Sequence, residues 1–424
     1  MHYDGNSGPS FGGIVFRIAT IQKLSRGGSN RNAEYGPPMR TARLQFQSLA
    51  GSDRLQILVA DFQELRTARG TRIAVGINDG NSETHMDRDG VPGCGPQPLL
   101  PTDGSGMHSM RIVSLLASAT EIVCALGAGE MLVGRSHECD NPDWVRRLPA
   151  CSEPAFDVSV SSREIDTEVR RRLRSGEPLY HVHGELIREL RPDLLIAQAH
   201  CEVCAVTPGD VQRSGACSLT AQQMALSAAS LEEIFQSIRR ISQALDLEEQ
   251  GEVLVRRERQ RLDTVRKEAA RFAPPTVVML EWTDPVFAMG NWGPELVEIA
   301  NGKLLLGRKG EYSAAIPGEQ LRVADPEYLI VAPCGYNLER SLRELAILEQ
   351  YPWWRELQAV RKGNVAFADG NLFFNRSGMT ISQTAEIIAE ILHGVSFGGT
   401  AGVHWRRIEA QAASDAPQIL VSRT

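Results

Sequence analysis

The sequence predicts an α/β protein with two Rossmann-like lobes, each built on a parallel sheet, joined by a long helical connector and preceded by a disordered N-terminal extension. Three observations predict this class. Strand-like and helix-like segments alternate from residue 111 onward, which is typical of parallel sheets covered by helices. The alternation stops at residues 230–273 and then resumes. Residues 1–107 hold 16 of the 38 glycines without a sustained period, so this extension cannot bury much apolar surface.

The N-terminal lobe is predicted at residues 111–229. Its first strand is "RIVSLL", and the helix "SATEIVCALG" follows, with Ser118 as the N-cap and Glu121 three residues later. "MLVGRS" is the second strand, and "ELIRELRPDLLIAQ" repeats the order of helix and strand. These segments indicate βαβ units and therefore a parallel sheet.

The connector and the C-terminal lobe follow. Ser230 and Glu233 form a second capping box, and apolar residues then keep a helical spacing until two prolines end the run at residue 274. The C-terminal lobe is predicted at residues 276–395, from the segments "TVVMLEW", "GPELVEIANG", "EYLIVAP", "LERSLRELAIL", "NVAFAD" and "SQTAEIIAEILHG". Residues 396–424 are expected to form a tail.

Composition excludes several classes of protein. The chain has 424 residues, 42% of them hydrophobic, and a net charge of −7, so it lacks the basic excess that nucleic acid binding requires. No apolar run reaches the ~18–20 residues of a membrane span, so we expect neither a nucleic acid partner nor an integral membrane protein. The first thirty residues show no basic segment followed by an apolar core. We therefore expect a cytoplasmic protein, and a periplasmic one only if the true start or the export route differs.

Reactive side chains follow the predicted strands. The loops after the carboxyl ends of parallel strands line the ligand crevice of such folds. The expected ligand-binding residues on these loops are Glu281, Trp282, Trp292, Cys334, Phe373 and Asn375. Tryptophans are common in cores, but at strand ends they also offer flat walls to a large planar macrocycle such as a corrin. We therefore expect an aromatic, thiol-lined cleft between the lobes.

Two loops of the N-terminal lobe could hold a metal. "HECD" and "HCEVC" supply thiols and imidazoles, which can share one tetrahedral zinc or iron ion. The candidate metal ligands are His137, Cys139, His200, Cys201 and Cys204. A reduced, partly buried thiol cluster and a redox-active pair fit the same CxxC spacing, so all three interpretations stay open.

Several motifs resemble a known family. They are "IVSLLASATEIVCALG", "GRSHECDNP", "CEVCAV", "LEWTDPVFAMGNWGPELVE", "APCGYNLERS" and "DGNLFFNRSG". Residues 111–394 resemble the type III solute-binding proteins of ABC importers, and most of all a cobalamin-binding protein-like subgroup. The resemblance implies a binding protein rather than an enzyme, with cobalamin, another corrinoid or a metal chelate as its small-molecule ligand and an ABC permease as its partner. A second class stays open: a cytosolic metal-binding or thiol-redox protein or enzyme that reuses the fold through its HECD and CEVC loops.

Overall fold

The computed structural model describes residues 45–47, 56–58, 110–199, 203, 205–215, 221–398 and 400–410. The chain divides into two compact units, Met1–Gly93 and Cys94–Thr424. In the first unit, β1 (Gln45–Gln47) pairs antiparallel with β2 (Gln56–Leu58). The rest of the extension expected at residues 1–107 lies outside the described residues. All elements that follow belong to the second unit.

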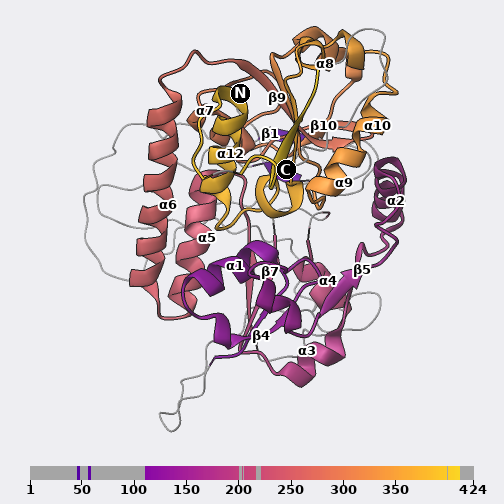
Figure 1. The fold of residues 1–424 in the computed structure, drawn as a ribbon. Coiled ribbons are helices and arrows are strands. Elements are labelled where there is room, and N and C mark those ends of the chain that lie inside the picture. The colour runs from indigo at the N-terminus through magenta and orange to yellow at the C-terminus, as the bar shows by residue number, and fades with distance from the viewer. Residues whose placement is uncertain are drawn as a thin grey trace, which may run out of the picture. The chain divides into compact units, whose positions relative to one another are not determined.

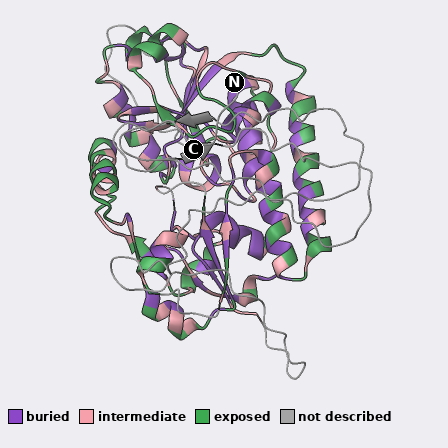
Figure 2. Ribbon diagram, turned by 180° about the vertical axis from the view of Figure 1, so that it is seen from behind, coloured by how far each residue is buried: buried purple, intermediate pink, exposed green. Residues whose placement is uncertain are grey.

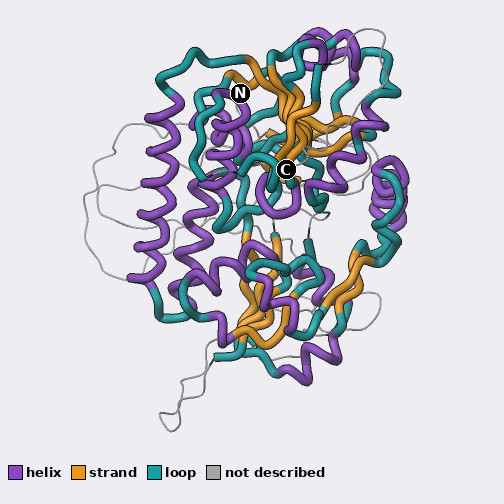
Figure 3. The backbone as a smooth tube through the Cα atoms, viewed as in Figure 1, coloured by secondary structure: helices purple, strands orange, loops and turns teal. Residues whose placement is uncertain are grey.

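The N-terminal lobe contains a four-stranded sheet in the order β4-β3-β7-β8, and every pair in it is parallel. The strands are β3 (Ile112–Ser114), β4 (Leu132–Arg135), β7 (Leu194–Gln198) and β8 (Gln222–Leu226). The helices are α1 (Ala117–Ala125), α3 (Gly184–Leu190) and α4 (Pro208–Arg213), with short helical turns η1 (Gly129–Met131) and η2 (Asp143–Arg147). Figure 3 shows these strands grouped at the centre of the lobe with helices around them.

Successive residues of the buried strands sort onto the two faces of this sheet, because side chains alternate along a strand. Leu194 and Ile196 of β7 enter the large core that contains α1 and α5. Leu195, between them, enters a separate core on the other face, together with Val113 of β3. Burial on both faces explains why these strands read as unbroken apolar runs.

A hairpin with a helix at its tip extends from this lobe. Strands β5 (Ser152–Pro154) and β6 (Tyr180–Val182) pair antiparallel, and α2 (Ser162–Ser175) lies between them in sequence. Ser161 and Glu164 form the capping box that begins α2, and Gly176 ends the helix with a φ of 71°, a left-handed conformation that glycine adopts without strain. We call residues 152–182 the arm. Most of α2 is exposed (Figure 2), and the strand and helix assignments above did not include it.

The predicted connector consists of two helices rather than one. α5 (Leu231–Ala244) packs against α1, and α6 (Glu248–Ala269) packs against α5 and α12, as Figure 1 shows. The chain turns between the helices at Asp246, whose φ is 55°. Ser230 caps α5 as predicted by accepting a bond from the Glu233 N–H, whereas the Glu233 carboxylate accepts from the Ala229 N–H. The box is therefore only half formed.

The C-terminal lobe has a mixed sheet in the order β12-β10-β9-β13-β14-β15, with β11 beside β9. Its core is parallel, while β10, β12 and β15 add antiparallel pairs. The strands are β9 (Thr276–Thr283), β10 (Val286–Ala288), β11 (Lys303–Leu304), β12 (Ala314–Ala315), β13 (Tyr328–Val331), β14 (Val365–Ala368) and β15 (Trp405–Ile408). The helices are α7 (Gly293–Ile299), α8 (Gly318–Ala324), α9 (Leu338–Arg343), α10 (Leu345–Leu348), α11 (Gln358–Arg361) and α12 (Ile381–His393), with the shorter turns η4 (Trp354–Glu356) and η5 (Gly370–Phe374).

Two sequence expectations differ from this fold. The lobe continues past residue 395, because β15 of the expected tail pairs with β14 and its Trp405 is buried, donating a hydrogen bond to Glu390. The prediction that Ser118 and Glu121 form a capping box is wrong. α1 begins at Ala117, after Leu116, so both residues lie inside the helix, and both are buried. Glu121 instead contacts the opposite lobe, as described below. Among the described residues, no helix is both long and apolar enough to cross a membrane.

Candidate ligand-binding site

A cavity of about 680 Å³ is lined by residues of both lobes. The N-terminal lobe contributes the start of α1, the loop after β4 and the inner side of the arm. The C-terminal lobe contributes the end of β9 and the loops after β10, β13 and β14. The cavity therefore lies at the carboxyl edges of the parallel strands, where folds of this kind bind ligands.

The structure brings most of the predicted site residues to this cavity. Those that line it are Glu281, Trp282, Trp292, Cys334, Asn375 and His137. Phe373 is not among them, because it is buried and packs edge-on against His404 with the ring centres 4.6 Å apart. Cys139 is also buried away from the cavity lining. His200, Cys201 and Cys204 lie outside the described residues.

Trp282 links the cavity wall to the arm. Its Nε1 donates to the Ser162 carbonyl at 3.2 Å, and its ring centre lies 5.2 Å from that of Tyr336. Trp292 is only 7% exposed, so it is mostly core with one side on the cavity. The sequence left open whether these tryptophans belong to the core or to the wall of the cleft. In the structure, each packs against other residues and also lines the cavity.

Two carboxyl groups on the lining are poised to carry a proton. Burial raises the pKa of Glu281 to about 7, although Ser313 opposes the shift by donating a hydrogen bond to it. Burial also raises the pKa of Glu138 to about 7, against the opposing effect of nearby Arg376. Near neutral pH each group is partly a neutral acid, which can donate as well as accept a hydrogen bond.

The HECD loop does not gather metal ligands. His137 Nδ1 lies 3.0 Å from Ser152 Oγ, and burial, with Arg135 nearby, lowers the pKa of His137 to about 4. Cys139 Sγ lies 3.0 Å from Thr120 Oγ1, and burial raises the pKa of this thiol. The part of the chain that the structure describes contains no group of three or more His, Cys, Asp or Glu side chains able to hold a metal ion. A site that includes the CEVC loop stays a prediction.

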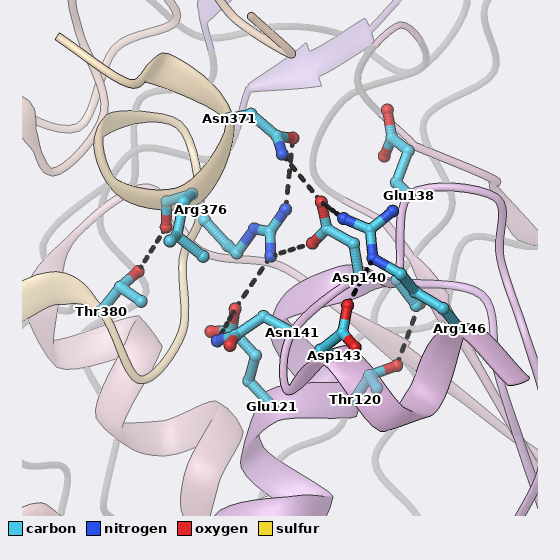
Figure 4. Close-up of polar contacts among 12 residues, drawn as sticks. Thr120, Glu121, Glu138, Asp140, Asn141, Asp143, Arg146, Asn371, Arg376 and Thr380 are labelled. Carbon is cyan, nitrogen blue, oxygen red and sulfur yellow. Dashed lines mark hydrogen bonds and ion pairs between the residues drawn. The ribbon is translucent and has the colours of Figure 1, made fainter. Parts of the chain in front are cut away.

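A buried ion cluster crosses between the lobes beside the cavity (Figure 4). Arg376 follows η5 in the C-terminal lobe and is 4% exposed. Its Nη1 donates to Glu121 at 2.9 Å and to Asp140 at 2.8 Å, both in the N-terminal lobe. Asn371 and Asn141 donate further bonds to Asp140 and Glu121, respectively. We call these five residues the interlobe cluster.

The charges of the interlobe cluster depend on one another. Burial raises the pKa of Glu121, and Arg376 and Asn141 oppose that shift. Burial acts to lower the pKa of Arg376, but Glu121 and Asp140 outweigh it and raise the value. The guanidinium thus stays charged, with two carboxyl groups within hydrogen-bond distance of its Nη1.

The other two guanidinium groups on the lining are also engaged. Arg340 stacks on Tyr336 at 3.8 Å and donates to the carbonyls of Val158 and Val160 in the arm. Arg170 pairs with Asp166 at 2.6 Å. Sequence reasoning missed Arg376, Arg340 and Arg170. Arg376 directly follows the motif "DGNLFFN", but its partners lie more than 230 residues away in sequence.

Two α/β lobes around a shared cavity are the architecture of a bilobed solute-binding protein. Residues 112–372 match the family described as Periplasmic binding protein, and the chain belongs to this family. Its members are solute-binding proteins rather than enzymes, in agreement with the expectation of a binding protein. A search of curated proteins finds no match.

Solved structures of the same fold agree with this assignment. A periplasmic heme-binding protein from Pseudomonas aeruginosa is 20% identical, with a TM-score of 0.52, over 68% of this chain and 94% of its own. The heme-binding protein RhuT from Roseiflexus sp. RS-1 is 23% identical, with a TM-score of 0.51, over 67% and 98%. HutB, the heme-binding protein of Vibrio cholerae, is 20% identical, with a TM-score of 0.50, over 67% and 99%.

The expected cytoplasmic location is wrong. The family and these structural neighbours are periplasmic binding proteins, which points to the periplasm. The expectation depended on the composition of the first thirty residues, and those residues lie outside the part of the chain that the structure describes.

Proposed function

We propose that this protein binds a corrinoid, or another metal chelate without carboxylate arms, in the interlobe cavity and delivers it to an ABC permease. One observation carries the ligand class. Among the described residues, the three guanidinium groups on the lining are already bound to carboxylates, carbonyls or a tyrosine ring. Each of these side chains thus already has partners within the protein, whereas bound carboxylates are typically held by guanidinium groups that pair with them directly.

The acidic groups favour the same ligand class. Corrinoids carry amide side chains, which offer both donors and acceptors, whereas porphyrins such as hemin carry two carboxylates. Glu281 and Glu138, with pKa values raised to about 7, can hydrogen bond to amides in either protonation state. A ligand carboxylate near them would meet like charge at higher pH. The cavity of about 680 Å³ is also within the ~300–1,000 Å³ typical of small-molecule sites.

Titration calorimetry tests this proposal directly. Cyanocobalamin, dicyanocobinamide, hemin and a ferric siderophore would be titrated separately into the full chain. We expect a corrinoid to bind at least about tenfold more tightly than hemin, which corresponds to about 1.4 kcal/mol. Asp263→Asn is a suitable control, because Asp263 pairs with Arg266 on α6, away from the cavity lining.

Two outcomes would contradict the proposal. Tighter binding of hemin would show that the engaged arginines are released for its carboxylates. Absence of corrinoid binding at high micromolar concentration, with the variant and the wild type equally well folded, would remove the corrinoid assignment altogether.

A further inference from the structure

The arm is a separate substructure held together at its own base. Its two strands pair antiparallel at the N-terminal lobe. The side chain of Arg172, in the last turns of α2, donates to the carbonyls of Ala155 and Pro178 at 3.0 Å each. These carbonyls lie just after β5 and just before β6, so α2 is bonded to both chain segments that lead to it.

The beginning of α2 is bonded to the opposite lobe. Arg163 donates to Asp284 at 2.7 Å. The Ser162 carbonyl accepts from Trp282, and Arg340 donates to Val158 and Val160. The arm therefore starts in the N-terminal lobe and reaches the C-terminal lobe at its tip (Figure 1). Its inner side lines one side of the cavity.

The inner side of α2 carries an apolar stripe. Ile165, Val169 and Leu173 recur every four residues, as expected for one face of a helix, and all three line the cavity. Leu173 is nevertheless 44% exposed. The opposite side is charged, with Arg171 paired to both Glu168 and Glu177.

We infer that the arm is a specificity-determining wall of the cavity, in which Ile165, Val169 and Leu173 contact an apolar face of the bound ligand. The tip bonds hold that wall in place. The inference rests on the proposed ligand site and adds a requirement: the ligand presents an apolar surface, such as the methyl-bearing rim of a corrinoid, to α2. A ligand that covers Leu173 removes its exposed apolar surface from water. Burial of this surface makes the binding free energy more favourable for ligands that present an apolar surface to Leu173.

The first experiment measures ligand affinity. Cyanocobalamin would be titrated into wild type, Leu173→Ser and Val253→Ser. Val253 is the matched control, because it is a 49% exposed apolar residue on α6 and does not line the cavity. We expect Leu173→Ser to weaken binding about tenfold and Val253→Ser to leave it unchanged. Equal affinity of all three proteins would overturn the inference, whereas a wild type that binds no corrinoid would refute the proposed function instead.

The second experiment measures attachment of the arm without any ligand. α2 contains five trypsin sites, namely Arg163, Arg170, Arg171, Arg172 and Arg174. Asp284→Asn leaves all five intact but removes the charge that holds Arg163. Asp284 also accepts a hydrogen bond from the Tyr351 hydroxyl, so Tyr351→Phe is the control that disturbs Asp284 without touching the arm.

Trypsin should cut α2 about threefold faster in Asp284→Asn than in wild type or Tyr351→Phe, because the tip detaches more often. Cleavage positions would be mapped by mass spectrometry. Unchanged cleavage within α2 in Asp284→Asn would show that the tip bonds do not hold the arm and would overturn that part of the inference.

Discussion

The lobes contact each other through two kinds of ion pair with similar geometry and different burial. In the interlobe cluster, Arg376 donates to Glu121 at 2.9 Å, and the two side chains are 4% and 2% exposed. At the tip of the arm, Arg163 lies 2.7 Å from Asp284, but its side chain is 71% exposed. The shorter contact is the one that water can replace more easily. Distance alone therefore does not rank these contacts, and burial does.

The difference assigns different roles to the two contacts. A buried ion pair is costly to break, because the remaining partner loses water and counter-charge together. A pair with one exposed partner, such as Arg163 with the largely buried Asp284, contributes less, because water solvates the exposed cation. The interlobe cluster is therefore suited to fix the lobes at the cavity's edge, and the tip of the arm is suited to detach. Four predictions test this comparison.

Replacing Arg376 with methionine should have the largest effect. The variant leaves Glu121 without a cation and Asp140 with only the exposed Arg146 at 3.4 Å. We expect the free energy of unfolding to fall by about 3–5 kcal/mol. Urea unfolding followed by circular dichroism measures this change. A triple variant that adds Glu121→Gln and Asp140→Asn should recover much of the loss, because no uncompensated charge remains. A loss under about 1 kcal/mol for Arg376→Met would place this cluster in the same class as the arm tip.

Gly378→Ala should have the next largest effect. An added Cβ would lie 2.9 Å from the Ser118 Cβ and 3.0 Å from its Cα, so the loop after Arg376 would be pushed away from α1. We expect a loss of about 1–3 kcal/mol in the free energy of unfolding. Gly398→Ala is the control, since no atom lies within 4 Å of its added Cβ. Equal melting temperatures of the two variants would show that the lobes separate here at no cost.

Local patterns were enough to predict the lobes but not the contacts between them. The apolar runs at Leu194–Gln198 and Thr276–Thr283 became β7 and β9, because burial on both faces leaves a continuous apolar signature in sequence. The same reasoning placed Glu281 and Trp282 at a strand end, and the structure puts both on the cavity. Parallel strands bring their carboxyl ends to one edge, so this part of the site follows from topology.

The remaining features depend on contacts between residues distant in sequence. Glu121 looks like the third position of a capping box, and only the position of Arg376, 255 residues later, shows its role. The apolar residues of α2 have the spacing of a helix that packs on a core. Most of the other α2 residues are charged, which is typical of a solvent-exposed helix. In the structure, the apolar residues line the cavity. β15 was assigned to a tail, because four residues without a neighbouring helix carry too little pattern to reveal their pairing with β14.

The pH dependence of stability should change in Glu281→Gln. The folded protein raises the pKa of Glu281 from its usual 4.5 to about 7, so the folded state binds more protons than the unfolded state between these values. The contribution of this group to the free energy of unfolding is therefore full below pH 4.5 and is lost as the pH rises toward 7. Relative to Glu281→Gln, wild type should lose at most ~1.4 kcal/mol per pH unit in this window.

Ser313→Ala provides the matched comparison for this effect. The Ser313 hydroxyl donates to the Glu281 carboxylate and lowers its pKa, so its removal should extend the loss of stability to higher pH. Thermal unfolding at half-unit steps from pH 4.5 to pH 8 would be measured for all three proteins. Parallel curves for wild type and Glu281→Gln would mean that water in the cavity solvates the carboxylate fully.

Arg163→Ala should have the smallest effect on stability. Its guanidinium is largely solvated, so its removal should lower the free energy of unfolding by only ~0.2–1 kcal/mol. Asp284 keeps its hydrogen bond from Tyr351, whereas loss of Arg376 takes a buried guanidinium from two carboxylates at once. Raising the salt concentration should weaken the pair in wild type, since salt screens exposed charges. The difference in the free energy of unfolding between wild type and Arg163→Ala should therefore become smaller. A loss as large as that of Arg376→Met, insensitive to salt, would mean that the tip of the arm is part of the fixed interface and cannot detach for ligand exchange.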